Sequence, residues 1–171
     1  PKVLRSQPFT APNSILGPNG ERWVPVHGIV PHSLAPAAQA ALSALFAKHA
    51  DAIAQHQIEI GYLYTVVGAQ GFLLEPVFYW PDARTEFHER VVEPALLARL
   101  SKHAAAPGGY ATVQALKRAA ADCLRAMGAS HFQMGKFYRY RAHQDASSLR
   151  LIDALKQALD PRGVLNPGAL L

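Results

Sequence analysis

The sequence IEIGYLYTVV (residues 58–67), followed by GAQG (68–71) and FLLEPVFYW (72–80), decides the fold. Both outer runs are rich in β-branched and aromatic residues, and the first alternates in part between polar and apolar positions. The short turn between them carries two glycines, which suits a connection between antiparallel neighbours. We therefore predict a β-hairpin whose strands cover residues 58–67 and 72–80.

A third strand is expected upstream of the hairpin, over residues 23–31. Its sequence WVPVHGIVP is β-branched and aromatic but contains two prolines, so we expect it at a sheet edge or bulged at Pro25 and Gly28. A helix over residues 34–55 follows, with apolar residues at helical spacing and Pro36 in the first turn, where proline is tolerated. The hairpin thus gains a neighbouring strand and a covering helix.

Helices dominate the chain after the hairpin. Pro107-Gly108-Gly109 breaks the helical pattern, and we interpret it as the end of the first of these helices. The segment after the second helix alternates loosely and is predicted to be a strand or an extended segment. In chain order, the expected elements are helices over residues 85–104 and 112–127, the extended segment over 130–140 and a helix over 147–159.

The resulting order, β-α-β-β-α-α-β-α, indicates an α+β fold. We expect a small, mostly antiparallel sheet covered on one face by helices, in a ferredoxin-like arrangement. The opposite face of the sheet is then left to meet a ligand or a second domain. Residues 1–20, rich in Pro, Asn, Ser and Gly, are interpreted as a linker that leads into one domain over residues 21–171.

The charge balance favours an anionic small molecule or an acidic partner over nucleic acid. The 171 residues carry 17 basic and 12 acidic side chains, a formal net charge of +5, but the lysines and arginines are scattered along the chain. No run of about 18 apolar residues occurs, so no membrane span is expected. Because the sequence begins with Pro1 rather than Met, we interpret it as part of a longer protein, expected in the cytoplasm, with a periplasmic location left open.

The chain ends in two closely spaced turns, DPRG (160–163) and NPG (166–168). Pro161 cannot continue the helix before it, and Gly163 supplies a positive-φ position for a helix cap. The second turn combines the fixed φ of proline with the freedom of glycine. This control over the backbone predicts that the terminal loop is held against another surface.

The densest run of aromatic and basic side chains is FQMGKFYRYRAH, residues 132–143. On an extended segment, Tyr138 and Tyr140 share one face. Arg139 and Arg141 share the opposite face. Phenol hydroxyls near a guanidinium can hold a phenolate, a carboxylate or the edge of a flavin. The alternative interpretation is an ordinary edge strand with solvated arginines.

No self-sufficient catalytic set is visible in the sequence. Its eight histidines lack the spacing of a metal site, so no metal is expected. A G-x-S-x-G nucleophile elbow is missing, and the GAQG turn joins two strands rather than opening a helix, as a phosphate loop does.

The terminal sequence DPRGVLNPG (160–168) resembles the C-terminal signature of FAD-linked oxidases of the vanillyl-alcohol oxidase and p-cresol methylhydroxylase type. The likeness extends to GPNG (17–20) with the strand after it, and to the end of the hairpin, EPVFYW (75–80). In that family an N-terminal domain binds FAD, and an α+β cap domain covers the flavin and shapes the substrate pocket. The resemblance implies that residues 21–171 form such a substrate-binding cap domain.

The resemblance also implies roles for particular residues. The family's phenol-oxidising members bind the substrate phenolate with a Tyr-Arg pair, which is matched here by Tyr140-Arg141 in a Tyr-Arg-x-His pattern; Tyr138-Arg139 is the nearly equal alternative. The implied catalytic residues are Tyr140, Arg141 and Tyr138; the implied substrate-binding residues are Tyr62, Tyr64, Arg139 and His143; the implied cofactor-binding residues are Asn166, Pro167 and Gly168. For Tyr62 and Tyr64, packing in the core is the alternative role.

The cofactor implied by the resemblance is FAD, bound without a covalent link. Some family members attach FAD through a His or Tyr upstream of the domain, and residues 1–20 contain neither. The N-terminal FAD-binding domain, which the resemblance implies to hold most of the cofactor, is not among these 171 residues, so the chain is not expected to be active by itself.

The expected function is that of the cap domain of a FAD-dependent oxidoreductase that oxidises a small alcohol or phenolic substrate by hydride transfer to the flavin. Its expected partners are the FAD-binding domain, the small-molecule substrate and an electron-acceptor protein. Substrate, electron acceptor and oligomeric state stay open. The alternative is a non-enzymatic α+β binding or interaction domain.

Overall fold

The computed structural model describes residues 12–133 and 135–169. In chain order, its elements are η1 (Asn13–Ile15), β1 (Arg22–Pro25), β2 (Gly28–Pro31), η2 (His32–Leu34), α2 (Ala35–Ala47), α3 (Ala50–Gln55), β3 (Glu59–Val67), β4 (Gly71–Trp80), α4 (Glu86–Val91), α5 (Pro94–Leu97), α6 (Pro107–Ala126), η3 (Tyr140–His143) and α7 (Ala146–Leu159), where η marks a 3₁₀ helix.

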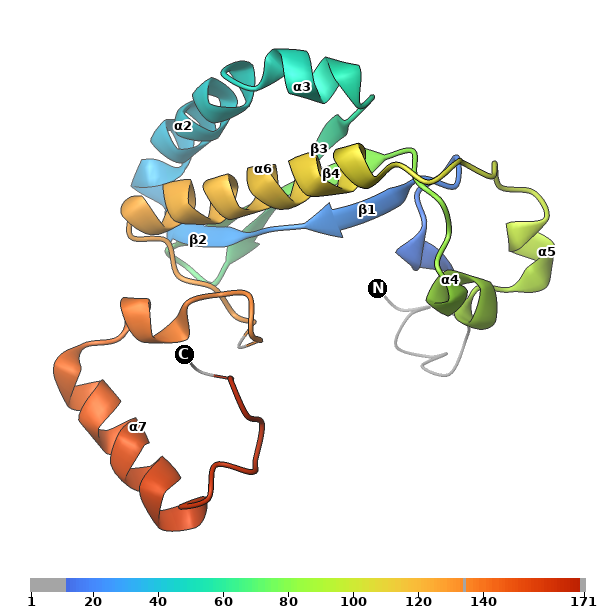
Figure 1. The fold of residues 1–171 in the computed structure, drawn as a ribbon. Coiled ribbons are helices and arrows are strands. Elements are labelled where there is room, and N and C mark those ends of the chain that lie inside the picture. Colours follow the sequence, from blue (N-terminus) through green and yellow to red (C-terminus); the bar gives the residue numbers. More distant parts are fainter. Residues whose placement is uncertain (1–11, 134, 170–171) are drawn as a thin grey trace.

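Strand β4 is the centre of a fully antiparallel sheet (Figure 1). It pairs with β3 on one side and with β1 and then β2 on the other. The predicted hairpin is confirmed, with strand bounds that differ from the expected ones by one residue. Pro76 accounts for the break between β1 and β2, because its carbonyl accepts the N–H of Val26 but it has no N–H to give in return.

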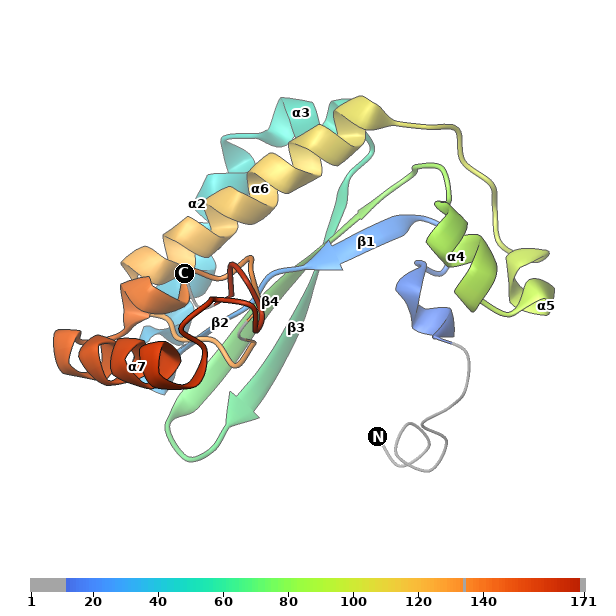
Figure 2. The ribbon, with the colours of Figure 1, turned by 60° about the horizontal axis from the view of Figure 1, so that its bottom comes forward.

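Helices α2 and α6 cover one face of the sheet, and the core lies between the helices and the sheet (Figures 1 and 2). The core includes Val26, Val30, Leu42, Phe46, Ile58, Leu74, Phe78, Trp80, Val113, Leu116 and Leu124. The predicted α+β fold, with helices on one face of a small antiparallel sheet, is confirmed. The strand order matches a ferredoxin-like βαββα unit that lacks a full fourth strand.

Two of the predicted helices are interrupted. The helix expected over residues 34–55 consists of α2 and α3, separated at Lys48 and His49. The helix expected over 85–104 is reduced to the short α4 and α5. Helix α4 ends at Val91, because Val92 already has an extended backbone with a ψ of 142°. Glu93 precedes Pro94 and is extended too, with a ψ of 131°, since the residue before a proline avoids helical geometry.

Helix α6 begins at Pro107, earlier than predicted, so the interpretation of PGG as a helix end is wrong. Proline is tolerated in the first turn of a helix. The glycines let this turn approach its neighbours closely. A Cβ on Gly108 would lie 2.9 Å from the ring of His56, and one on Gly109 would lie 3.3 Å from Trp80.

The buried carboxylate of Asp82 fastens the start of α6 to the sheet. It accepts hydrogen bonds from the Ala106 N–H at 2.8 Å and the Trp80 indole at 3.1 Å, and it pairs with Arg22 at 2.9 Å. Burial acts to raise the pKa of Asp82, but the hydrogen bonds from Ala106 and Trp80 outweigh it and hold the pKa below its usual value. Asp82 is therefore ionised and fully partnered at neutral pH.

The segment over residues 130–140, predicted as a strand or an extended segment, forms neither in its described part, which bends over residues 135–138. Of the described residues 130–133 and 135–140, only Ser130 pairs with the sheet through its backbone, by two hydrogen bonds with Ile29 of 2.8 and 2.9 Å at the outer edge of β2. Residues 135–139 form no helix or strand and lead into η3. Without an extended backbone, the expected placement of tyrosines and arginines on two opposite faces is lost.

Helix α7 and the terminal loop lie at the periphery, away from the sheet in Figure 1, and no residue of α7 is buried. Gly163 has the predicted positive φ, +64°. The Asp160 carboxylate accepts the N–H groups of Val164 and Leu165, both at 2.9 Å, and forms an ion pair with Lys156 of α7. The first half of the terminal loop is thus held by α7 itself.

The predicted linker, residues 1–20, is described only from residue 12 onward. In this part Leu16 is buried against Val92 and Leu97, in a small cluster separate from the main core. Within the described ranges, no helix is both long and apolar enough to cross a membrane.

Candidate functional site

The sheet edge between β1 and β2 contains a buried histidine, His27, that is paired with Tyr138. The His27 N–H donates to Tyr138 Oη at 2.9 Å, and His27 Nδ1 lies 2.8 Å from the same oxygen. Only 3% of His27 is exposed, and the ring of Phe132 stacks on it at 4.4 Å between centroids. The Tyr138 oxygen therefore occupies the place where a fourth strand would present a backbone carbonyl.

Hydrogen bonding assigns the tautomer of His27. The Phe132 N–H donates to Nε2 at 3.4 Å, so Nε2 carries the lone pair and we place the ring proton on Nδ1. Nδ1 then donates to Tyr138, whose own hydroxyl proton is left for another acceptor. Burial, with the nearby His131 as a smaller cause, lowers the pKa of His27 to about 4, which keeps the ring neutral at pH 7.

Tyr138 is a neutral phenol at pH 7. Burial raises its pKa to about 12; the hydrogen bond from the His27 backbone opposes the shift and the negative charge of Glu75 adds to it. Glu75 lies on β4, and burial raises the pKa of its carboxyl as well. Neighbouring side chains of a strand point to opposite faces of the sheet. Leu74 faces the core under α2 and α6, so Glu75 lies on the other face, which these helices do not cover.

Two further histidines extend the cluster. The ring of His131 stacks on Tyr138 at 4.4 Å and meets His143 edge-on at 5.2 Å. Both ring nitrogens of His131 are buried and have no hydrogen-bond partner among the described residues. Burial, followed by the influence of His131 and Arg125, lowers the pKa of His143. The cluster is thus a set of stacked imidazole and phenol rings with unused hydrogen-bonding capacity.

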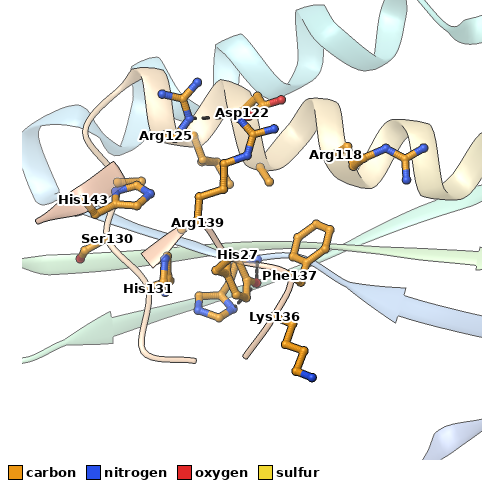
Figure 3. A pocket seen from close by; sticks show the side chains of 15 residues that line it. His27, Arg118, Asp122, Arg125, Ser130, His131, Lys136, Phe137, Arg139 and His143 are labelled. Atoms are coloured by element: carbon orange, nitrogen blue, oxygen red, sulfur yellow. Dashed lines mark hydrogen bonds and ion pairs between the residues drawn. The ribbon is translucent and has the colours of Figure 1, made fainter. Parts of the chain in front are cut away.

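These rings line a cavity of about 170 Å³, here called the histidine cavity, between the C-terminal half of α6 and the segment that follows it (Figure 3). Its rim is basic, with cationic side chains from Arg118, Arg125, Lys136 and Arg139. Asp122 is the one carboxylate among the lining residues, 3.6 Å from Arg125 and 3.7 Å from Arg139. The cavity therefore carries a surplus of positive charge.

A second cavity, of about 570 Å³ and here called the terminal cavity, lies between α7 and the terminal loop. Arg141 lines it and binds Asp153 of α7 through two hydrogen bonds of 2.7 and 2.8 Å. Asn166, Pro167 and Gly168 line the same cavity. The structure thus brings Arg141 together with the three residues that the resemblance implied for cofactor binding.

The other implied site residues lie elsewhere. Tyr138, Arg139 and His143 line the histidine cavity, and Tyr140 lines neither cavity. Tyr62 and Tyr64 stack on each other at 5.6 Å on β3. Their register opposite Pro76 and Leu74 places them on the helix-covered face, where the Tyr64 hydroxyl donates to Gln39 of α2 at 2.9 Å. Tyr62 and Tyr64 thus line neither of the two cavities.

His27, His131 and Glu75 were not identified by sequence reasoning. His27 and His131 are neighbours in the fold but lie far apart in the sequence, and no spacing rule relates them. The sequence contains one signal for His27, which lies between Pro25 and Pro31 in a strand-like run. Prolines interrupt the hydrogen bonds between strands, so nearby backbone groups are free to bind side chains.

No three His, Cys, Asp or Glu side chains in the described part of the chain are arranged to hold a metal ion. No protein-family model, curated protein or solved structure matches this chain.

Proposed function

We propose that this chain is the substrate-covering cap part of a FAD-dependent oxidoreductase that oxidises a small alcohol or phenolic substrate. The observation that carries the proposal is the lining of the terminal cavity. Arg141 and the segment Asn166-Pro167-Gly168, which begins 25 positions later in the sequence, line it together. The resemblance implied a substrate role for Arg141 and a cofactor role for the other three. Because these residues line the same cavity, their arrangement supports a site where substrate and cofactor are held next to each other.

The residues of the terminal cavity fit one edge of a flavin rather than a whole FAD. Arg141 and Lys156 line the cavity, each paired with one carboxylate, that of Asp153 or Asp160. The remaining donors of the Arg141 guanidinium suit the electron-rich edge of an isoalloxazine ring or a substrate oxyanion. The described glycines do not form a pyrophosphate loop, because GAQG forms the β3–β4 turn and Gly108 and Gly109, which open α6, pack against His56 and Trp80. When bound, the flavin accepts the hydride from the substrate carbon.

Arg141 is prepared for such a role by Asp153. The two hydrogen bonds to Asp153 fix the plane of the guanidinium and use two of its donors, leaving the others for a ligand oxygen. Arg141, with Tyr140 next to it in sequence, would polarise or deprotonate the substrate oxygen. Tyr138 lies in the histidine cavity, where its hydroxyl oxygen is bound to His27. It would therefore position the segment that leads to Arg141 and would not contact the substrate itself.

The outer side of α7 supports a second domain as partner. Leu151, Leu155 and Leu159 recur at every fourth position and are 62%, 52% and 77% exposed. Val164 and Leu165 of the terminal loop are 61% and 59% exposed. An apolar stripe of this kind marks a surface that another protein surface covers. We assign this cover to the FAD-binding domain.

The test uses the natural full-length polypeptide that contains this chain. We expect purified protein to show flavin absorption that bleaches when the substrate alcohol is added without an electron acceptor. Arg141→Lys should lower kcat/KM by about 100-fold, because a lysine cannot reproduce the planar, doubly bonded guanidinium. Arg90→Lys is the matched control, since Arg90 pairs with Glu86 on the surface of α4. A colourless full-length protein would overturn the proposal.

The competing function is a non-enzymatic interaction domain. The same apolar stripe on α7 favours it, because that stripe suits any protein partner with an apolar surface. The absorption spectrum separates the two functions: flavin in the full-length protein supports the oxidoreductase, and its absence together with a stable protein complex supports the interaction domain.

A further inference from the structure

We propose that the histidine cavity is a binding site for a small organic carboxylate, separate from the terminal cavity. The two cavities share no lining residue, so this ligand is not the one that Arg141 would meet. The proposal stands whether the full-length protein is an oxidoreductase or an interaction domain.

Charge is the first argument. Four cationic side chains line the cavity against one carboxylate, that of Asp122. Asp122 lies 3.6 Å from Arg125 and 3.7 Å from Arg139, distances well beyond the roughly 2.8 Å of a charge-assisted hydrogen bond. Both guanidiniums therefore keep free donors. Figure 3 shows Arg139 extending toward Asp122 and Arg125, so that the two arginines stand on one side of the cavity.

The buried side of the cavity supplies a second argument. Both nitrogens of the His131 ring are enclosed without a partner among the described residues, and its neighbours Tyr138 and His143 meet it through ring faces and edges. A buried polar group without a partner is unfavourable. A carboxylate that enters beside His131, with a small rotation of the ring, gives it one.

Size and shape select the ligand class. A volume of about 170 Å³ corresponds to roughly six water molecules, which excludes nucleotides and peptides. Part of the lining is apolar, from Ala121, Leu124, Ala129 and Phe137. A carboxylate with a short apolar tail satisfies both the arginines and this apolar wall, whereas inorganic phosphate satisfies only the arginines.

The test is a titration of the 171-residue chain, followed by backbone amide NMR at constant ionic strength, with propionate, inorganic phosphate and chloride as probes. We expect saturable shifts for propionate at Ser130, His131, Arg139 and His143, weaker binding of phosphate, and no saturation with chloride. Because the chain is titrated without flavin, the outcome does not depend on whether the full-length protein carries a flavin.

Variants locate the site. Replacing both Arg125 and Arg139 by Gln should weaken propionate binding about tenfold or more, through the loss of two charged donors. Arg99→Gln, on an exposed arginine near α5, removes a similar charge elsewhere and should leave the affinity unchanged. Non-saturating shifts, or equal affinities in the double variant and the unchanged chain, overturn the site. Phosphate binding as tight as propionate binding overturns the carboxylate assignment.

Discussion

The hydroxyl oxygen of Tyr138 accepts the backbone N–H of His27 at 2.9 Å and lies 2.8 Å from Nδ1 of the same residue. One side-chain oxygen thus serves both the main chain and the ring of a residue 111 positions away. Next to it, the backbone of Ser130 pairs with Ile29. Together these contacts close the sheet edge that a fourth strand closes in a complete ferredoxin-like domain.

Removing this oxygen should destabilise the fold. Tyr138→Phe leaves the His27 N–H buried without its acceptor, and we expect the free energy of unfolding to fall by about 1–3 kcal/mol. Urea denaturation measures the change. Tyr64→Phe is the control: it removes a single hydrogen bond, to Gln39, from a residue that is 45% exposed, whereas Tyr138→Phe removes the two contacts with His27, so the loss should be smaller. Equal losses in the two variants would contradict the role assigned to Tyr138.

Stability should decrease as the pH falls below about 6.5, in part because of His27. The pKa of His27 is about 4 in the folded protein, below its ordinary value of 6.5, so the unfolded chain binds more protons between these values. The full stabilisation is present above pH 6.5 and is lost as the pH falls toward 4. We expect His27 to contribute about 2 kcal/mol, less than the whole shift because solvent reaches the adjoining cavity.

The comparison of unfolding free energies at pH 7 and pH 4.5 isolates this contribution. His88 and His143 also have pKa values lowered by burial, and they act in the same direction in every variant. His27→Gln should therefore show a smaller pH dependence than the unchanged chain. His49→Gln, at an exposed position, should keep the full dependence. An unchanged slope in His27→Gln would show that His27 does not titrate as proposed.

The terminal loop should loosen when Asp160 is replaced. The carboxylate holds the N–H groups of Val164 and Leu165, so Asp160→Ala should speed hydrogen exchange of these two amides several-fold. The ion pair with Lys156 lowers the pKa of Asp160, so in the unchanged chain the protection should persist until the pH drops below the ordinary aspartate range. Asp51→Ala, at an exposed position of α3, should leave both exchange rates unchanged.

A charge on the apolar stripe of α7 should affect domain association and not the fold of this chain. Leu155 is half exposed, so Leu155→Glu should change the stability of the 171-residue chain by less than about 0.5 kcal/mol. If the proposed function holds, Leu155→Glu should lower the flavin content and the thermal unfolding temperature of the full-length polypeptide. Gln157→Glu, which also adds one negative charge to α7, is the control. Identical flavin content in both variants would show that the stripe does not contact the FAD-binding domain.

The parts of the fold predicted well are those where local pattern and packing agree. The predicted bounds of the hairpin and of α7 agree with the structure to within one residue. The hairpin strands are rich in β-branched residues, and α7 has amphipathic spacing that ends at a proline and a glycine, so each pattern fits few alternatives. The start of α6 was misplaced for a tertiary reason. Gly108 and Gly109 look like a helix end in sequence, yet they are needed where the helix closely approaches His56 and Trp80.

The segment after α6 was the least predictable from sequence. Its alternating aromatic and basic residues are typical of a strand, but its side chains are used for contacts with distant partners: Tyr138 with His27, and Arg141 with Asp153. Neither partner is visible from a local pattern. For the same reason the sequence predicted single residues of the candidate site, such as Arg139 and His143, but not the histidine cavity that unites them.

The closed edge of the sheet also bears on how the protein behaves at high concentration. An open strand edge is a template on which another chain can add a strand, and this is a common route to aggregates. Here the outward N–H of His27 is bound to a phenol oxygen, and both backbone groups of Ile29 are bound to Ser130. Because these contacts come from an irregular segment rather than a strand, they shield the edge without presenting a new one.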